Sequence, residues 1–129
     1  MAVKSSARQY PLIAELELTL AELAAVQDVK LPPGAVVLDI KAFVDTAFNA
    51  GTTNTLSIGD SGSATRFLNA GSVAAAGAVG SIAGFGRKYT VSDFVRFTYA
   101  QTGTAATAGA LRAYVSYVIA NRANEAQTT

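Results

Sequence analysis

The sequence contains no cysteine, no histidine and no tryptophan. Without cysteine the chain forms no disulfide and offers no thiolate, and without histidine as well it lacks the usual ligand sets for zinc and iron. An all-oxygen calcium site would have to use Asn54, Asp60 and Ser61, but the chain has no dense run of carboxylates of the EF-hand kind. We therefore expect no metal site and no cofactor.

Charge is also scarce, since charged residues make up 15% of the 129 residues and the formal net charge is +1. This balance lacks the basic excess of a nucleic-acid-binding protein. The longest weakly polar run, from Val73 to Gly86, is shorter than a bilayer helix and is rich in glycine. The beginning, MAVKSSARQYP, lacks the apolar stretch of a signal peptide. We expect synthesis in the cytoplasm and neither a nucleic acid nor a membrane as partner.

The stretch Ser57 to Ser63, SIGDSGS, is close to the loop that carries the nucleophile of trypsin-like serine proteases. A serine hydroxyl needs a base to take its proton, and the histidine that serves there is absent. The four lysines, Lys4, Lys30, Lys41 and Lys88, lie in contexts typical of solvent-exposed side chains. We therefore predict that the protein is not an enzyme. The stretch is interpreted as a polar turn in which Asp60 accepts hydrogen bonds from the amides that follow it.

Alternating apolar and polar residues predict most of the strands. From Leu12 to Leu20 the even-numbered residues are apolar, which places Glu15 and Glu17 on the face toward water or a partner. The helix formers from Ala21 to Gln27 predict a short helical connector that ends before Leu31-Pro32-Pro33-Gly34.

A long strand is predicted to begin at Ala35 and to form a hairpin with a short strand over residues 55–58. Two further strands, over residues 94–100 and 110–119, are predicted to form a second hairpin across a Gly/Thr-rich loop. In the first of these, Val95, Phe97 and Tyr99 face the core. Many strands and one short helical segment predict a single domain with an all-β fold, an antiparallel β-sandwich. Residues 1–9 are interpreted as an amino-terminal arm and residues 121–129 as a mobile tail.

Several apolar residues fall on strand faces that are usually charged in a soluble monomer. They are Val37, Phe43, Tyr114 and Val118. One explanation is that both faces of an inner strand are buried, with a loop over one of them. The other is a subunit interface that buries these residues against another copy of the chain.

Three segments of the chain resemble the head decoration, or cement, proteins of tailed bacteriophages. They are LPPGAVVLDIKAFVDTAFN, TLSIGDSGSATRFLNAG and TAGALRAYVSYVIANRANEAQ. The resemblance runs from about Tyr10 to Gln127 and is carried by strand and turn patterns. It implies a jelly-roll-like β-sandwich, a homotrimer, and binding to the major capsid protein on the outside of the virion. Lys4 and Arg8, in the amino-terminal arm, are the candidate capsid contacts.

A carbohydrate-binding module of a phage tail or host-attachment apparatus is the alternative. β-Sandwiches often carry sugar sites on their loops, formed by aromatic side chains with Asp or Asn. Tryptophan is absent, which leaves Tyr89 and Tyr99 as candidate platforms. Tyrosines in strands more often belong to a core or an interface.

Overall fold

The structure is a computed structural model, and it describes residues 9–120. These residues form strands and one turn of 3-10 helix. In chain order the elements are β1 (Leu12–Thr19), η1 (Glu22–Ala24), β2 (Gln27–Leu31), β3 (Ala35–Thr46), β4 (Thr53–Gly59), β5 (Leu68–Ser72), β6 (Gly77–Ala78), β7 (Lys88–Tyr89), β8 (Asp93–Thr102) and β9 (Ala110–Ile119).

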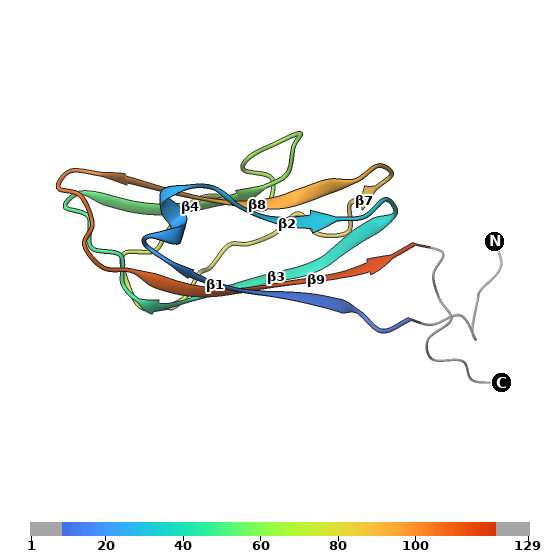
Figure 1. Ribbon diagram of the computed structural model, residues 1–129, viewed down its shortest axis with the longest axis horizontal. Coiled ribbons are helices and arrows are strands. Elements are labelled where there is room, and N and C mark those ends of the chain that lie inside the picture. Colours follow the sequence, from blue (N-terminus) through green and yellow to red (C-terminus); the bar gives the residue numbers. More distant parts are fainter. Residues whose placement is uncertain (1–8, 121–129) are drawn as a thin grey trace.

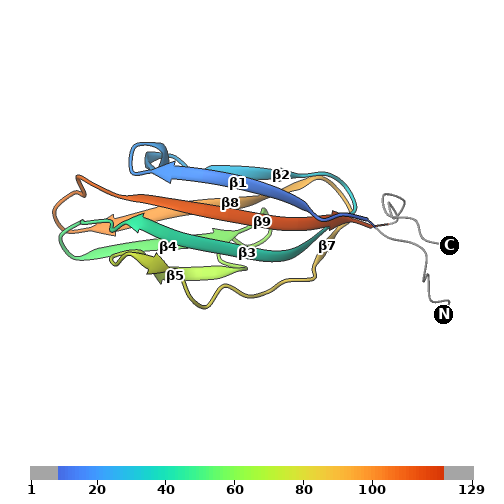
Figure 2. The ribbon, with the colours of Figure 1, turned by 90° about the horizontal axis from the view of Figure 1, so that it is seen from below.

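The strands form two antiparallel sheets that lie as two layers (Figure 1). One sheet has the order β1-β9-β3-β6, with β7 also paired to β3, and the other has the order β2-β8-β4-β5. The predicted antiparallel β-sandwich is therefore confirmed. Figure 2 views the molecule from the side of the first sheet, with β1 along its edge.

Successive strands alternate between the two layers along most of the chain. If β6 and β7, which both pair with β3, are taken as one interrupted strand, each sheet contains four strands. The first and last strands, β1 and β9, lie side by side, as do β2 and β8. This interleaved order is that of a jelly roll.

Both predicted hairpins are wrong, because the strands concerned lie in different sheets. β3 belongs to one sheet and β4 to the other, and the same holds for β8 and β9. Each connection therefore crosses from one layer to the other. Phe48 follows β3 in one crossing and is buried, with its ring centroid 4.8 Å from that of Tyr99. Alternation assigns the inward face of a strand, but it does not say which strand is the neighbour.

The core lies between the sheets and contains the inward residues that alternation predicts. In β8, Val95 and Phe97 are fully buried and Tyr99 packs against the core. In β9, Leu111, Ala113 and Val115 are inward, and in β1 the even-numbered residues face the core. Burying each large apolar side chain stabilises the fold by about 1.5 to 3 kcal/mol.

The prediction for Val37 is wrong. Val37 was expected on the outer face of β3, yet it is fully buried, and its neighbour Leu38 is 44% exposed. The register between β3 and β9 shifts between Val37 and Asp39, as at a β-bulge. One extra residue reverses the inward and outward positions on the two sides of a bulge. Beyond it the predicted alternation holds, with Ile40 buried and Phe43 exposed.

The structure contains four strands that the sequence did not predict, namely β2, β5, β6 and β7. The helical connector is shorter than predicted, because η1 ends at Ala24 and β2 begins at Gln27. β5, β6 and β7 lie in or beside the Ala/Gly-rich part, where side chains carry little strand signal.

Gln9 was assigned to the arm, but its side-chain amide binds both the N–H and the C=O of Ile119. The rest of the arm, with Lys4 and Arg8, and the tail at residues 121–129 lie outside the described residues. Within residues 9–120 no helix has the length and hydropathy to span a bilayer.

Candidate functional site

The SIGDSGS stretch forms a turn around the carboxylate of Asp60. One oxygen, Oδ1, accepts hydrogen bonds from the backbone N–H groups of Gly62 and Ser63, each at 3.0 Å. This confirms the predicted role of Asp60 as a turn aspartate. Gly59 precedes it at a crowded position, where a Cβ atom would lie 2.1 Å from the carbonyl oxygen of Ser63. The turn therefore requires glycine at residue 59.

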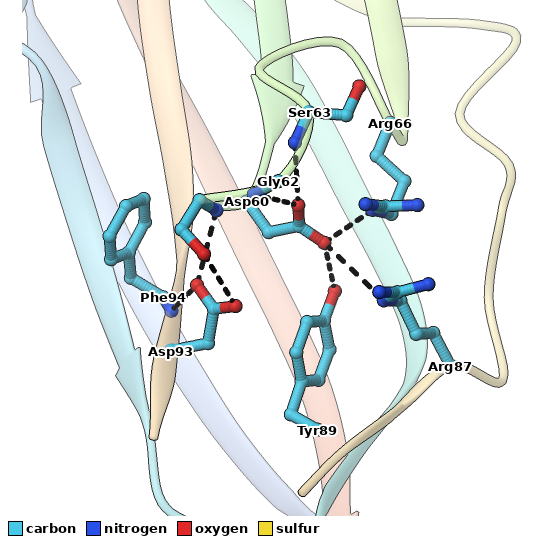
Figure 3. Close-up of polar contacts among 9 residues, drawn as sticks. Asp60, Gly62, Ser63, Arg66, Arg87, Tyr89, Asp93 and Phe94 are labelled. Carbon is cyan, nitrogen blue, oxygen red and sulfur yellow. Dashed lines mark hydrogen bonds and ion pairs between the residues drawn. The ribbon is translucent and has the colours of Figure 1, made fainter. Parts of the chain in front are cut away.

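The other oxygen of Asp60, Oδ2, joins the turn to β7 and its flanking loop (Figure 3). It accepts hydrogen bonds from Arg66 and, at 2.6 Å, from the hydroxyl of Tyr89, and it forms a 4.0 Å ion pair with Arg87. Asp60 itself is 4% exposed. Burial raises its pKa, but the hydrogen bonds from Tyr89, Arg66 and the turn amide outweigh burial and hold the pKa below its usual value. The carboxylate is thus a buried, fully bonded anchor.

Ser61 points the other way, toward the beginning of β8. Its hydroxyl donates a 2.9 Å hydrogen bond to Asp93 Oδ2, and its N–H donates to Asp93 Oδ1. The same carboxylate also accepts from the N–H of Phe94 at 2.7 Å. Ser61 lines a hollow of about 230 Å³ together with Lys30, Leu31, Ser92, Asp93 and Phe94. These hydrogen bonds connect the turn to β8, so the role that the structure shows for Ser61 is structural.

The three residues considered as calcium ligands, Asn54, Asp60 and Ser61, belong to separate hydrogen-bond networks, and Ser61 binds Asp93. Asn54 Oδ1 accepts from the N–H of Ala50 and from the hydroxyl of Tyr99, whereas Asp60 binds the groups described above. In the described part of the chain, no three acidic residues gather where they could hold a metal ion. The three-residue calcium arrangement is therefore not assembled.

The two tyrosines considered as sugar platforms face inward. Tyr89 is buried with its hydroxyl on Asp60, and burial raises its pKa. Tyr99 packs against the core with its hydroxyl on Asn54, and burial raises its pKa as well. Tyr89 is therefore closed to a ligand, whereas Tyr99 is half-buried and lines a hollow of about 210 Å³ with Leu20, Leu23 and Gln101.

The outer face of the β1-β9-β3 sheet carries a group of apolar and aromatic side chains, which we name the outer-face cluster. Its members are Ile13, Val36, Leu38, Phe43, Tyr114 and Val118. Ile13 is 63% exposed and Phe43 is 43% exposed, while Tyr114 and Val118 are half-buried. Val36 pairs with Val118 across β3 and β9. The sequence prediction identified Phe43, Tyr114 and Val118, and all three lie on this face.

Charged residues surround the aromatic part of the outer-face cluster. Arg112 binds Asp45 through two hydrogen bonds, at 2.8 and 3.0 Å, and its guanidinium lies 5.2 Å from the centre of the Phe43 ring. Tyr114 sits between Glu15 on β1 and Lys41 on β3. The face therefore combines exposed apolar area with fixed charges, as protein interfaces do.

The outer face of the opposite sheet differs in character. Its side chains from β4 and β8 include Thr53, Thr55, Ser57 and Thr98. Its aromatic residue, Phe94, is half-buried, and Arg96 lies over the ring at 4.4 Å while binding Asp28. The strands of this face are therefore mainly polar, and the exposed apolar residues Val26 and Val91, at 45% and 71%, lie outside them, just before β2 and β8.

Sequence reasoning missed Ile13, Val36 and Leu38 as members of the outer-face cluster, and it placed Val36 and Leu38 on the inward face. Ile13 lies on the same face of β1 as Glu15 and Glu17, so the alternation of the strand predicts that Ile13 is exposed. The exposure of Leu38 could not be predicted in this way, because it depends on the bulge after Val37.

Comparisons with protein-family models, with curated proteins and with solved structures find no significant match to this chain.

Proposed function

We propose that the protein is a structural component of a tailed-phage virion, which assembles into a homotrimer through the outer-face cluster and binds the outside of the capsid. In this role the protein contributes surface, symmetry and rigidity. It requires no nucleophile, metal or cofactor. Its partners are two further copies of the chain and the major capsid protein.

The difference between the two outer faces is the observation that carries the proposed assembly through the outer-face cluster. The strands of one face expose Ile13, Leu38 and Phe43, each more than 40% accessible, and the strands of the other present Thr, Ser and paired charges. Val26 and Val91 are exposed as well, but they lie outside the strands. Large exposed apolar patches on soluble domains mark contact sites. Aromatic residues next to a positioned arginine, such as Phe43 with Arg112, are typical of the energetically important part of an interface.

A cyclic trimer fits a face with two unlike parts. Contacts in a three-membered ring are heterologous, which means that one region of a subunit meets a different region of its neighbour. The outer-face cluster has an aliphatic part around Ile13 and Leu38 and an aromatic part around Phe43 and Tyr114. We place these two parts against each other in neighbouring subunits.

The jelly-roll order is consistent with a virion role, because capsid domains use this architecture. It does not establish one, since lectin domains and cupins use it too. The phage assignment therefore depends on the resemblance of the three sequence segments to decoration proteins.

A reconstruction of the phage particle that carries this protein tests the proposal. We expect sandwich-shaped density on the outside of the head, arranged in threes, with the outer faces turned toward one another. Density in the tail, or a single copy with its outer face in solvent, would contradict it.

Carbohydrate binding is the second candidate, and the hollow beside Phe94 is the observation that favours it. This hollow of about 230 Å³ offers a half-buried ring with Ser61, Ser92 and Asp93. The Asp93 oxygens, however, already accept three hydrogen bonds from the protein. A glycan array with submillimolar binding that is lost in Phe94→Ala would favour this candidate over the virion role.

A further inference from the structure

The free edge of β1 is the longest regular strand edge in the described part of the chain. On one side β1 pairs with β9 in unbroken register from Leu12 and Tyr117 to Thr19 and Ala110. On the other side no strand of residues 9–120 pairs with it. Proteins normally protect such edges with bulges, proline, charged side chains (lysine above all) or very short strands. Within its eight residues β1 has no bulge, proline or lysine, and its charged residues are Glu15 and Glu17.

The other edges are protected in these ways. β5 pairs with β4 across a register shift and has Ala70 at a positive φ of 51°. β6 and β7 contain two residues each, and β2 carries Lys30. Among the edges of residues 9–120, β1 is therefore the one that is long, keeps an unbroken register and carries no positive charge.

The direction of the free backbone groups on β1 follows from one hydrogen bond. The N–H of Leu20 donates to the C=O of Gly109, which continues the register between β1 and β9. In an antiparallel pair the hydrogen-bonded residues alternate, so even-numbered residues of β1 bind β9. The N–H and C=O groups of Ile13, Glu15 and Glu17 therefore point away from the sheet. Thr19 ends this row, because its N–H donates to the carboxylate of Glu22.

The same residues give the edge its charge. Glu15 and Glu17 are exposed, two residues apart, on the outer face, and neither forms an ion pair with any described residue. Pairing of β1 with β1 of a second copy would place these carboxylates beside their equivalents. Like charges on neighbouring strands are destabilising. The edge is thus suited to a strand of opposite charge.

We propose that the free edge of β1 binds an extended segment of another protein that carries Lys or Arg at alternate positions. The segment extends the sheet by pairing with the backbone of Ile13, Glu15 and Glu17, as in β-strand addition. Its basic side chains lie beside Glu15 and Glu17. The inference goes beyond the proposed function, because it concerns the strand edge and not the outer-face cluster.

A pair of peptides tests this directly in the full-length protein. The probe is acetyl-Thr-Lys-Val-Lys-Val-Lys-Thr-amide, and the matched control has Glu in place of each Lys. We expect millimolar Lys peptide to slow the hydrogen exchange of the Ile13, Glu15 and Glu17 amides at least about threefold, and the Glu peptide to slow it less. No change with either peptide, or an equal change with both, would overturn the proposal.

Two variants separate the backbone from the charge. Glu15→Pro removes an N–H that points away from β9, a position where edge strands tolerate proline, and it should abolish peptide binding while Leu16 and Leu18 stay protected by β9. The double variant Glu15→Lys/Glu17→Lys keeps the N–H groups and should prefer the Glu peptide. If Glu15→Pro fails to fold, the reversed preference of the double variant decides, and an unchanged preference refutes the proposal.

A second copy at this edge is a further outcome of the same measurement. Protection of the Ile13, Glu15 and Glu17 amides that grows with protein concentration, without peptide, would overturn the inference. A trimer whose β1 amides exchange freely and ignore both peptides would also overturn it, and would leave the proposed assembly through the outer-face cluster standing.

Discussion

The hydroxyl of Tyr89 donates a 2.6 Å hydrogen bond to Asp60, and this contact ties β7 to the turn that follows β4. β7 belongs to one sheet and β4 to the other. The pair therefore joins the two layers at one place through a buried carboxylate. Arg66 and Arg87 contribute to the same carboxylate, so its loss affects several contacts at once.

Asp60→Asn should lower the free energy of unfolding by about 3 kcal/mol at neutral pH. It removes the negative charge that pairs with Arg66 and leaves buried donors poorly matched. The urea midpoint, followed by circular dichroism, measures this. Tyr89→Phe is the matched control, because it removes one hydrogen bond and should cost only about 1 kcal/mol. An equal loss of unfolding free energy in the two variants would show that the negative charge of Asp60 contributes nothing beyond its hydrogen bond to Tyr89.

The same carboxylate should make the fold sensitive to acid. The pKa of Asp60 is lowered in the folded protein, so its contribution is present above the unfolded-state pKa of about 3.9 and is lost as pH falls through the folded value. Asp28, whose pKa is lowered by its hydrogen bond to Arg96, adds a part with the same sign. Urea midpoints measured below about pH 4 should fall less steeply in Asp60→Asn than in the wild type. Parallel pH profiles would contradict this.

Gly59→Ala should destabilise the protein by about 1 to 3 kcal/mol. The new Cβ would lie 2.1 Å from the carbonyl oxygen of Ser63, so the turn must shift away from the contacts it makes. Gly80→Ala is the control, because a Cβ there meets no atom within 4 Å. Thermal unfolding of the two variants side by side gives the comparison, and similar midpoints would argue against a constrained turn.

Ser61→Ala should cost at most about 1 kcal/mol, the value of one hydrogen bond to Asp93. Assembly and capsid binding should be unaffected, because Ser61 is not a member of the outer-face cluster. A fluorophosphonate probe should leave the native wild-type protein unlabelled, because the sequence contains no histidine to activate the serine. Covalent labelling at Ser61, located by mass spectrometry, would restore the hydrolase interpretation.

Removal of residues 1–8 should spare the trimer and weaken attachment to the capsid. Gln9 must be kept, because its side chain binds both backbone groups of Ile119. The shortened protein loses Lys4 and Arg8, the candidate capsid contacts.

Because the net charge is only +1, attachment of the intact protein should persist at about 1 M salt, where charges are screened beyond roughly 3 Å. Release at that salt concentration would identify charge as the main attachment force.

The sequence predicts strand faces well where alternation is uninterrupted. β1 and β9 match their predicted inward and outward residues, because each keeps one register along its length with no inserted residue between them. Val37 and Leu38 exchange faces because one bulge in β3 reverses the parity. A single extra residue leaves no mark in the composition of the strand.

The sequence patterns did not predict the contacts between segments that are distant along the chain. The Gly-Asp-Ser-Gly pattern predicts that Asp60 binds the amides after it, since those groups are within three residues. It contains no sign that Tyr89 and Arg87 reach the same carboxylate from β7 and its loop. The wrong hairpins have the same origin, because the crossings after β3 and β8 are decided by how the two layers close over Phe48 and the rest of the core.

The mass of the protein in solution tests the assembly through the outer-face cluster most directly. Light scattering at micromolar concentration should give about three times the 13.2 kDa mass of the chain. Phe43→Ser should shift the mass toward the monomer, because it removes an exposed aromatic ring from the contact, whereas Phe94→Ser on the opposite face should leave the trimer intact. A wild-type mass equal to one chain at this concentration would contradict the account.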